Sequence, residues 1–173
     1  MSASYSVAVP NKEKTVAKIC CFAQRQDGHV IGLVKMAGKE MDLSTCRLIM
    51  GEALEGEDPA KASERLLREQ TRLEVNYTIA FYQYRNEQNG ECVEVYDMDV
   101  RRNSVPKSSD GSAEIAVWCH PWHLANGVDG DLARQVFQFN ETRVVEPVIY
   151  GHARNKEIVM PDEPDEEDEK TLV

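Results

Sequence analysis

The distribution of apolar and polar residues predicts that the chain is rich in β-strands. Six mostly apolar runs have the length and the aromatic or β-branched content that strands prefer, and they lie at 16–23, 30–36, 43–50, 75–85, 92–100 and 115–119. Asp27-Gly28 and Asn89-Gly90 each separate two of these runs, and such dipeptides favour tight hairpin turns. We therefore predict a hairpin at each dipeptide.

Two segments predict helices. Asp58 suits an N-cap and Pro59 a first helical position, and no Gly or Pro follows until after Thr71. A second helix is expected at 131–139. The other segments are expected to be loops at 37–42 and 101–112, a short connection from 121 to 125, and a strand or extended segment at 144–150. This order indicates an α/β sandwich of the α+β kind rather than a regular βαβ series.

The length of 173 residues suits one domain. We predict a loosely ordered N-terminus at 1–14, a domain at 15–152 and a tail at 153–173 that is acidic and disordered from about residue 161. Residues 161–173 hold seven acids and one lysine, so most of the net charge of −10 lies there. The body is only mildly acidic, which does not favour nucleic-acid binding without sequence preference. The tail is a candidate handle for a basic protein partner.

The five cysteines have no repeated spacing, and we predict that all are reduced. Cys20 and Cys21 are adjacent in a predicted strand, so their side chains should point to opposite faces of a sheet. No apolar run is long enough to span a membrane, and the first 14 residues lack the pattern of a targeting signal. We therefore expect a cytoplasmic protein with no membrane association.

The segment from Gly51 to Leu73 carries the strongest motif. It reads GEALEGEDPAKASERLLREQTRL, and it resembles the Nudix box, G-x5-E-x7-R-E-U-x-E-E-x-G-U, where U is a bulky aliphatic residue. Placed without a gap, the pattern matches at Gly51, Glu57, Arg65, Leu67, Glu69 and Leu73. The resemblance implies a Nudix-like mixed sheet with a box helix and a second, C-terminal helix.

The resemblance also implies roles for these residues. Gly51, Glu57 and Arg65 would form the structural part of the box, with Glu57 and Arg65 joining the loop to the helix. The metal-binding carboxylates of the family fall at positions 66, 69 and 70, which share one helix face. Clustered carboxylates bind Mg²⁺ or Mn²⁺, which activates water to cleave a diphosphate.

The chain departs from the box at the positions that carry the chemistry. Leu66 and Gln70 replace two carboxylates and leave only Glu69 on that face, so affinity for divalent cations should fall sharply. Arg72 replaces the Gly that normally takes a left-handed conformation after the helix, so we expect a different exit from the helix. The sequence thus predicts a retained framework and a degenerate Nudix box.

Some candidate site residues lie inside the box and others outside it. If the protein is active, Glu57, Glu69 and Glu114 could form a relocated catalytic site, with Glu57 and Glu69 as metal ligands. The alternative is that these are solvated surface acids. Guanidinium groups bind phosphate and aromatic rings stack on bases. The candidates for nucleotide contacts are therefore three arginines and one tyrosine: Arg65, Arg101, Arg102 and Tyr82.

Three functional hypotheses follow. The first is a Nudix-like pseudoenzyme that binds a nucleotide, a nucleoside-diphosphate compound or RNA, or serves as a subunit of a larger assembly. The second is an active, Mg²⁺- or Mn²⁺-dependent hydrolase of a nucleoside diphosphate linked to another group, using a relocated acid. The third is an unrelated α/β module for protein interactions. The loss of carboxylates at positions 66 and 70 favours the first over the second.

Overall fold

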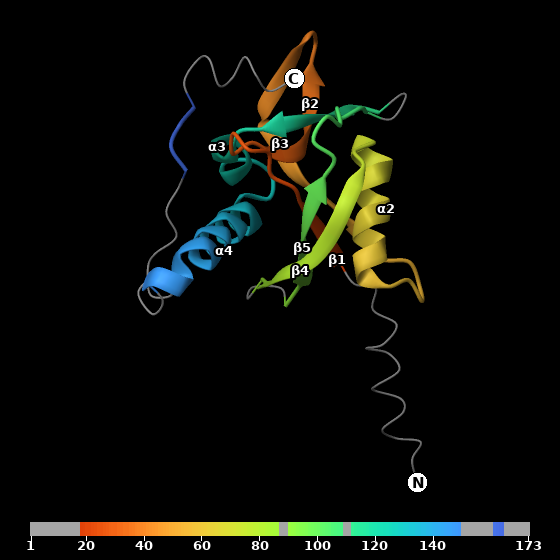
Figure 1. Cartoon of the computed structure of the whole chain (residues 1–173). Coiled ribbons are helices and arrows are strands. Elements are labelled where there is room, and N and C mark those ends of the chain that lie inside the picture. Colours follow the sequence, from red (N-terminus) through yellow and green to blue (C-terminus); the bar gives the residue numbers. More distant parts are fainter. Residues whose placement is uncertain (1–17, 87–89, 109–111, 150–160, 165–173) are drawn as a thin grey trace.

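The chain forms one six-stranded sheet with α2 on one face and α3 and α4 on the other (Figure 1). The computed structural model describes residues 18–86, 90–108, 112–149 and 161–164, with the backbone alone for 141–149. The elements are β1 (Lys18–Phe22), β2 (Val30–Ala37), β3 (Glu40–Glu52), α2 (Pro59–Thr71), β4 (Val75–Arg85), β5 (Cys92–Val100), β6 (Glu114–Cys119), α3 (Pro121–Ala125) and α4 (Gly130–Ile149).

The strand order is β4-β5-β1-β3-β2-β6, with β1 and β5 parallel and all other neighbours antiparallel. The mixed sheet of an α+β fold is therefore confirmed, and the second predicted hairpin is present as β4–β5. The first is confirmed only as a turn, because β3 lies between β1 and β2 in the sheet and a single bridge, from Gln24 to Val30, joins the two sides of the turn. The predicted loosely ordered segment at 1–14 lies outside the described residues. Of the predicted disordered tail, only 161–164 are described, and these form neither helix nor strand.

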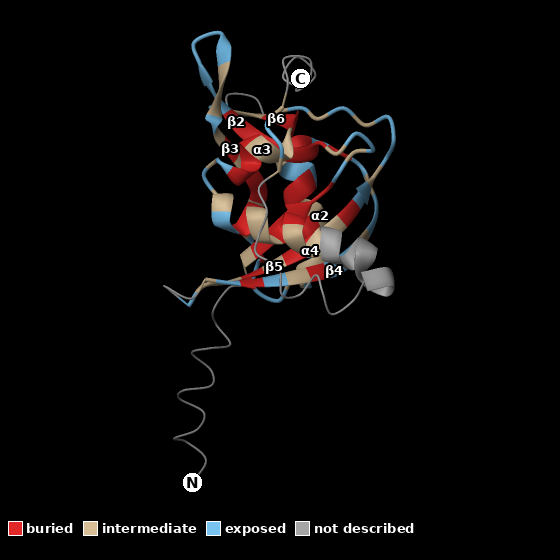
Figure 2. Cartoon of the chain, turned by 90° about the vertical axis from the view of Figure 1, so that its left-hand side faces the viewer, coloured by how far each residue is buried: buried red, intermediate tan, exposed pale blue. Residues whose placement is uncertain are grey.

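Each face of the sheet has its own hydrophobic core (Figure 2). Cys20 belongs to the core beneath α3 and α4, and Cys21 to the core beneath α2, so the predicted opposite orientation is confirmed. All five cysteines are free thiols. Phe22 on β1 stacks on Phe81 of β4 with ring centroids 5.4 Å apart, which extends the α4-side core to the edge strand.

The predicted loop at 37–42 is wrong, because β3 begins at Glu40 and pairs with β2 almost to its end. Ala37 pairs with Glu40, and Gly38 between them has a φ of +68°, which allows the chain to turn in two residues. The end of this hairpin projects beyond the helices and is exposed (Figure 2). Without a buried face, its sequence has no alternation from which a strand could be predicted.

The predicted strand or extended segment at 144–150 is also wrong as far as Ile149, because α4 continues from Gly130 to that residue. The strand preference of a short Val-containing segment is modest and depends on context, and here the segment, Pro147 included, continues a helix that has already begun. The predicted connection at 121–125 is a one-turn helix, α3, whose N-cap His120 accepts a hydrogen bond at Nδ1 from the Trp122 N–H. None of the helices in the described part of the chain could span a membrane.

Candidate functional site

Helix α2 carries the residues that match the box motif, and its start is the predicted one. Asp58 is the N-cap and accepts a hydrogen bond from the Lys61 N–H at 3.3 Å, and Pro59 occupies the first turn. At the other end, Arg72 has a φ of 62° and donates its backbone N–H to the Arg68 carbonyl at 2.9 Å. The prediction of a different exit is wrong, because Arg72 itself adopts the left-handed conformation that the family assigns to Gly.

Arg65 joins α2 to the loop that precedes it. Its guanidinium donates two hydrogen bonds to the Glu57 carboxylate, at 2.9 and 3.1 Å, and another to the Glu52 carbonyl at 2.9 Å. Glu57 also accepts from the Leu54 N–H, and the bonds from Arg65 hold the pKa of Glu57 below its ordinary value. The fourth contact of Arg65 is with Glu69, at 3.0 Å. Through these contacts Arg65 holds the loop that precedes α2 against the helix.

The two positions at which the box pattern has carboxylates, 66 and 70, hold side chains that contact β3. Leu66 is buried, and a Cβ on Gly51 would lie 2.4 Å from its Cδ2 atom, so the two residues are in close contact. Gln70 donates its side-chain N–H to the Met50 carbonyl at 3.0 Å. Its other polar atom, Oε1, is buried with no hydrogen-bond partner among the described residues. The face that would bind a metal in a Nudix enzyme therefore serves to attach the helix to the sheet.

The remaining acids do not fit the divalent cation that the resemblance implies. Glu57 and Glu69 are both bound to Arg65, whereas Glu114 on β6 accepts two hydrogen bonds from Arg47 of β3, at 2.8 and 2.9 Å. Arg47 also holds the pKa of Glu114 below its ordinary value. In the described ranges, no three His, Cys, Asp or Glu side chains are placed to hold a metal ion.

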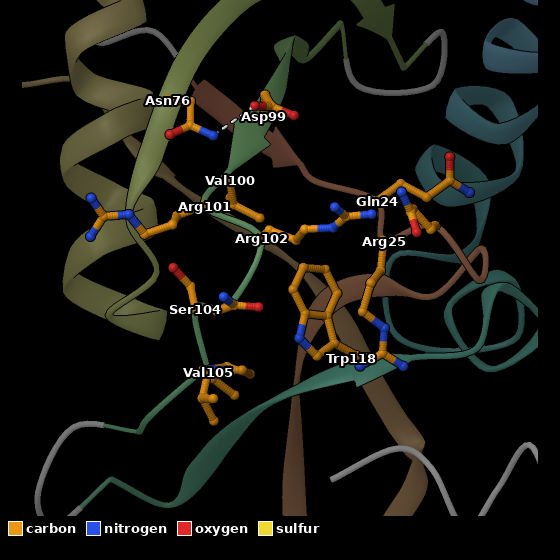
Figure 3. Close-up of a pocket in the computed structure, with 14 residues that line it drawn as sticks. Gln24, Arg25, Asn76, Asp99, Val100, Arg101, Arg102, Ser104, Val105 and Trp118 are labelled. Atoms are coloured by element: carbon orange, nitrogen blue, oxygen red, sulfur yellow. Dashed lines mark hydrogen bonds between the residues drawn. The ribbon is translucent and has the colours of Figure 1, made fainter.

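A cleft of about 690 Å³ lies beside the C-terminal end of β5 and beneath the segment 101–106 (Figure 3). Its apolar side is formed by Val100, Ala116 and Trp118. Polar residues from three separate segments line the rest of it: Gln24, Arg25, Gln26, Asn76, Asp99, Arg101, Arg102, Asn103 and Ser104. This size is within the usual range of small-molecule sites, and apolar surface with a few convergent polar groups is typical of them.

The β1–β2 turn contributes a fixed guanidinium to the cleft. Arg25 lies over the Trp118 ring, with its guanidinium carbon 5.3 Å from the ring centroid. Asp27 in the same turn accepts hydrogen bonds from Arg25, the shortest at 2.6 Å, and these lower the pKa of Asp27 far below its ordinary value. Arg25 is therefore held in place by an ion pair on one side and an aromatic face on the other.

The two arginines that follow β5 differ in orientation (Figure 3). Arg101 points toward α2 and forms an ion pair with Glu74. Arg102 extends across the cleft toward Gln24, is exposed, and has no ion-pair partner within the described ranges. On the neighbouring strands, the Asn76 amide donates to the Asp99 carboxylate at 2.9 Å.

The four residues predicted to contact a nucleotide lie in three places. Arg101 and Arg102 line the cleft, and Arg65 is held in the box. Tyr82 lies on the α4 side of the sheet, where its hydroxyl donates to Gln135 at 2.9 Å and its ring packs on Phe139. The sequence did not reveal Arg25, Trp118, Asn76 or Asp99 as cleft residues, since no local motif joins these distant segments.

No family model and no curated protein sequence matches the chain. Among solved structures, the E. coli ORF135 protein aligns with a TM-score of 0.54 and 16% identity, over 80% of this chain and 98% of that one. A proposed nudix hydrolase family member from Chromobacterium violaceum aligns with a TM-score of 0.53 and 16% identity, over 82% and 94% of the two chains.

The MutT protein from Methanosarcina mazei Go1 aligns with a TM-score of 0.53 and 13% identity, over 74% of this chain and 94% of that one. The fold is Nudix-like. At these identities the likeness concerns the backbone arrangement and does not extend to chemistry. The third hypothesis is wrong in expecting a fold unlike that of Nudix proteins, and its protein-interaction role stays a prediction.

Proposed function

We propose that the protein is a Nudix-like pseudoenzyme that binds a nucleotide, a nucleoside-diphosphate compound or RNA, or that serves as a subunit of a larger assembly. One observation carries this proposal: positions 66 and 70 of the box helix hold side chains that pack on β3. Leu66 fills the space above Gly51, and Gln70 donates a hydrogen bond to the Met50 carbonyl. Neither side chain offers a charge to a metal ion.

The remaining acid on that face also argues against efficient hydrolysis. A divalent cation that activates water needs several oxygen ligands, usually including more than one carboxylate. Glu69 shares the Arg65 guanidinium with Glu57, so a cation near it would have to compete with a fixed positive charge. The cleft beneath 101–106 supports the binding part of the proposal, because it combines apolar surface with guanidinium groups.

Hydrolysis assays test the catalytic part. The full chain would be incubated with nucleoside triphosphates, ADP-ribose, dinucleoside polyphosphates and capped RNA, with Mg²⁺ or Mn²⁺, beside a Glu69→Ala variant. We expect no turnover above the rate in buffer, and a thermal shift with at least one compound.

Turnover that disappears in Glu69→Ala would contradict the proposal and support a relocated metal site. A Glu114→Gln variant would then show whether that site extends to β6. If no compound is cleaved and none shifts the melting temperature, the assembly-subunit form of the proposal remains. In that case, pull-down experiments with and without residues 161–173 would test the acidic tail as the contact for a protein partner.

A further inference from the structure

We infer that the free edge of β4 binds an extended, basic segment of a partner protein, which would add one strand to the sheet. This inference rests on the proposed function in its assembly-subunit form, and it assigns that form a surface and a kind of partner. The surface, called the β4 edge below, consists of residues 77–80 and the outer side of their backbone. It shares no residue with the cleft or with α2.

The backbone of β4 has a hydrogen-bonded neighbour on one side only. β5 pairs with it from Val75 to Arg85, and β4 is the last strand of the sheet (Figure 1). In the described part of the chain, no other segment forms backbone hydrogen bonds with its outer side. Proteins usually protect such an edge with lysine, proline or a very short strand. β4 has 11 residues, no proline and no charged side chain before Arg85, so its edge is open to a further strand.

Two irregularities in the pairing with β5 limit the regular part of this edge. They lie between Val75 and Tyr77 and between Ala80 and Tyr82, so the regular part is 77–80. Bulges bend and twist a strand, which makes its ends poor templates for pairing. The β4 edge therefore suits a short added segment rather than the full edge of another sheet.

Tyr77 and Ile79 form an uncovered apolar strip beside this edge. Thr78 between them donates its hydroxyl to Glu64 of α2 at 3.0 Å, so its two neighbours point to the opposite face, on which α4 packs. Further along that face, Phe81 is buried in the core beneath α4, whereas Tyr77 and Ile79 are 55% and 50% exposed. Side chains of an added strand would lie opposite both, and aromatic and β-branched residues stabilise such cross-strand pairs.

Charge selects the chemistry of the partner. β5 carries three acids, and the only cation of the two strands is Arg85 at the far end. Asp99 pairs with Tyr77 in the sheet, and Asp97 pairs with Ile79. A lysine or arginine of the added strand would lay its apolar stem over Tyr77 or Ile79 and bring its charge toward these carboxylates. The β4 edge thus fits a strand in which basic and apolar residues alternate.

The same charges disfavour a second copy of the chain as the occupant. Pairing two β4 edges would bring together two chains of net charge −10, each with the three acids of β5. The arginines that follow β5 point elsewhere, Arg101 toward α2 and Arg102 toward Gln24 (Figure 3). A basic segment of another protein is attracted by the charge that repels a second copy.

The test is fluorescence anisotropy with the full chain and three short labelled peptides. In the first, valine alternates with lysine, and in the second, glutamate replaces lysine. The third has the first sequence with every backbone N–H methylated, which keeps the charge and removes the hydrogen-bond donors. It therefore controls for ionic attraction to the acidic residues of 161–173.

The protein variants are Ile79→Lys and Tyr77→Lys, beside Val128→Lys as a matched control. Val128 is also an exposed apolar residue, at 65%, and lies between α3 and α4. Because all three side chains are largely exposed, we expect the variants to fold, and melting temperatures would verify this. Amide hydrogen exchange would locate the bound peptide.

We expect the wild type to bind the valine–lysine peptide and to bind each of the other peptides at least about tenfold more weakly. Ile79→Lys and Tyr77→Lys should each lose about tenfold or more in affinity, because they remove an apolar contact and repel the lysines. Val128→Lys should change the affinity by less than about twofold. Exchange should slow at 77–80 when the peptide binds.

Three results would overturn the inference: no binding of the valine–lysine peptide, equal binding of its methylated form, or slowed exchange at 101–106 instead of 77–80. A dimer in sedimentation experiments that Ile79→Lys dissociates would also overturn it, because a second copy would then occupy the β4 edge. Each of these results leaves the hydrolysis and ligand assays of the proposed function to be decided on their own. Conversely, diphosphate hydrolysis would refute the pseudoenzyme proposal and leave the β4 edge assignment intact.

Discussion

At the scale of single residues, Arg72 shows how position can override residue type. The end of α2 needs one residue in the left-handed conformation, and here an arginine adopts it. For a residue with a Cβ this conformation is unfavourable by about 1–2 kcal/mol. The cap still forms, because the Arg72 N–H bonds to the Arg68 carbonyl and the next residue, Leu73, is fully buried. From the sequence one could predict that the helix ends here, but not that its exit keeps the family's geometry.

Replacing Arg72 with glycine should therefore stabilise the protein. Glycine removes the steric strain but adds freedom to the unfolded chain, so we expect a net gain of about 0.5–1 kcal/mol in the free energy of unfolding. Urea denaturation would measure it. Arg68→Gly, inside the helix, is the control and should destabilise by about 1 kcal/mol. A loss of stability in Arg72→Gly would show that the arginine side chain stabilises the fold in another way.

At the scale of elements, α2 was the most predictable part of the fold, because the sequence contains its N-cap, its first-turn proline and its length. The ends of β3 and α4 were not predictable, since an exposed hairpin has no buried alternation and a helix can continue through Val-rich sequence. The motif also identified Leu66 and Gln70 as departures from the box. The motif does not show what the side chains of Leu66 and Gln70 contact, because Gly51 and Met50 come near them only when β3 and α2 pack together.

Returning both carboxylates to α2 should weaken its attachment to the sheet. Leu66→Glu places a charge in a buried site and should cost about 3 kcal/mol or more, whereas Leu66→Met should cost less than about 1.5 kcal/mol. Gln70→Glu removes the donor to Met50 and should cost about 1–3 kcal/mol at pH 7. That cost should shrink at lower pH, because a protonated carboxyl can again donate.

Thermal and urea unfolding with and without Mg²⁺ would measure these changes. We expect Mg²⁺ to leave the double variant no more stable than EDTA does. A large stabilisation by Mg²⁺, accompanied by diphosphate hydrolysis, would show that the metal site needs only its two missing carboxylates.

At the scale of the whole molecule, the sheet brings together residues that no local pattern connects. Arg102 could be selected from the sequence because it is a cation beside a loop, but Arg25 and Trp118 could not. Their contact depends on β2, which pairs with β6 and so places the β1–β2 turn beside Trp118. The Arg47–Glu114 pair connects β3 to β6 across the same strand, β2.

That ion pair should make part of the stability depend on pH. Because Arg47 lowers the pKa of Glu114 from its ordinary value of 4.5, the ionised carboxylate stabilises the fold above that value. This contribution is lost as pH falls through the lowered pKa. Glu114→Gln should therefore be less stable than the wild type at pH 7, and the difference should diminish between about pH 5 and pH 3. Glu40→Gln, at an exposed acid of the hairpin, is the control, and an equal pH profile for the two variants would refute the assignment.

The contact between Leu66 and Gly51 also bears on how the chain could change over generations. A carboxylate at position 66 gains a metal partner only when position 70 is acidic as well, and each change alone disturbs the junction of α2 with β3. An ancestor or descendant that passes between the two states one substitution at a time must go through a less stable intermediate. Packing at this junction would thus slow single substitutions in both directions and tend to keep the chain in the state that it already has.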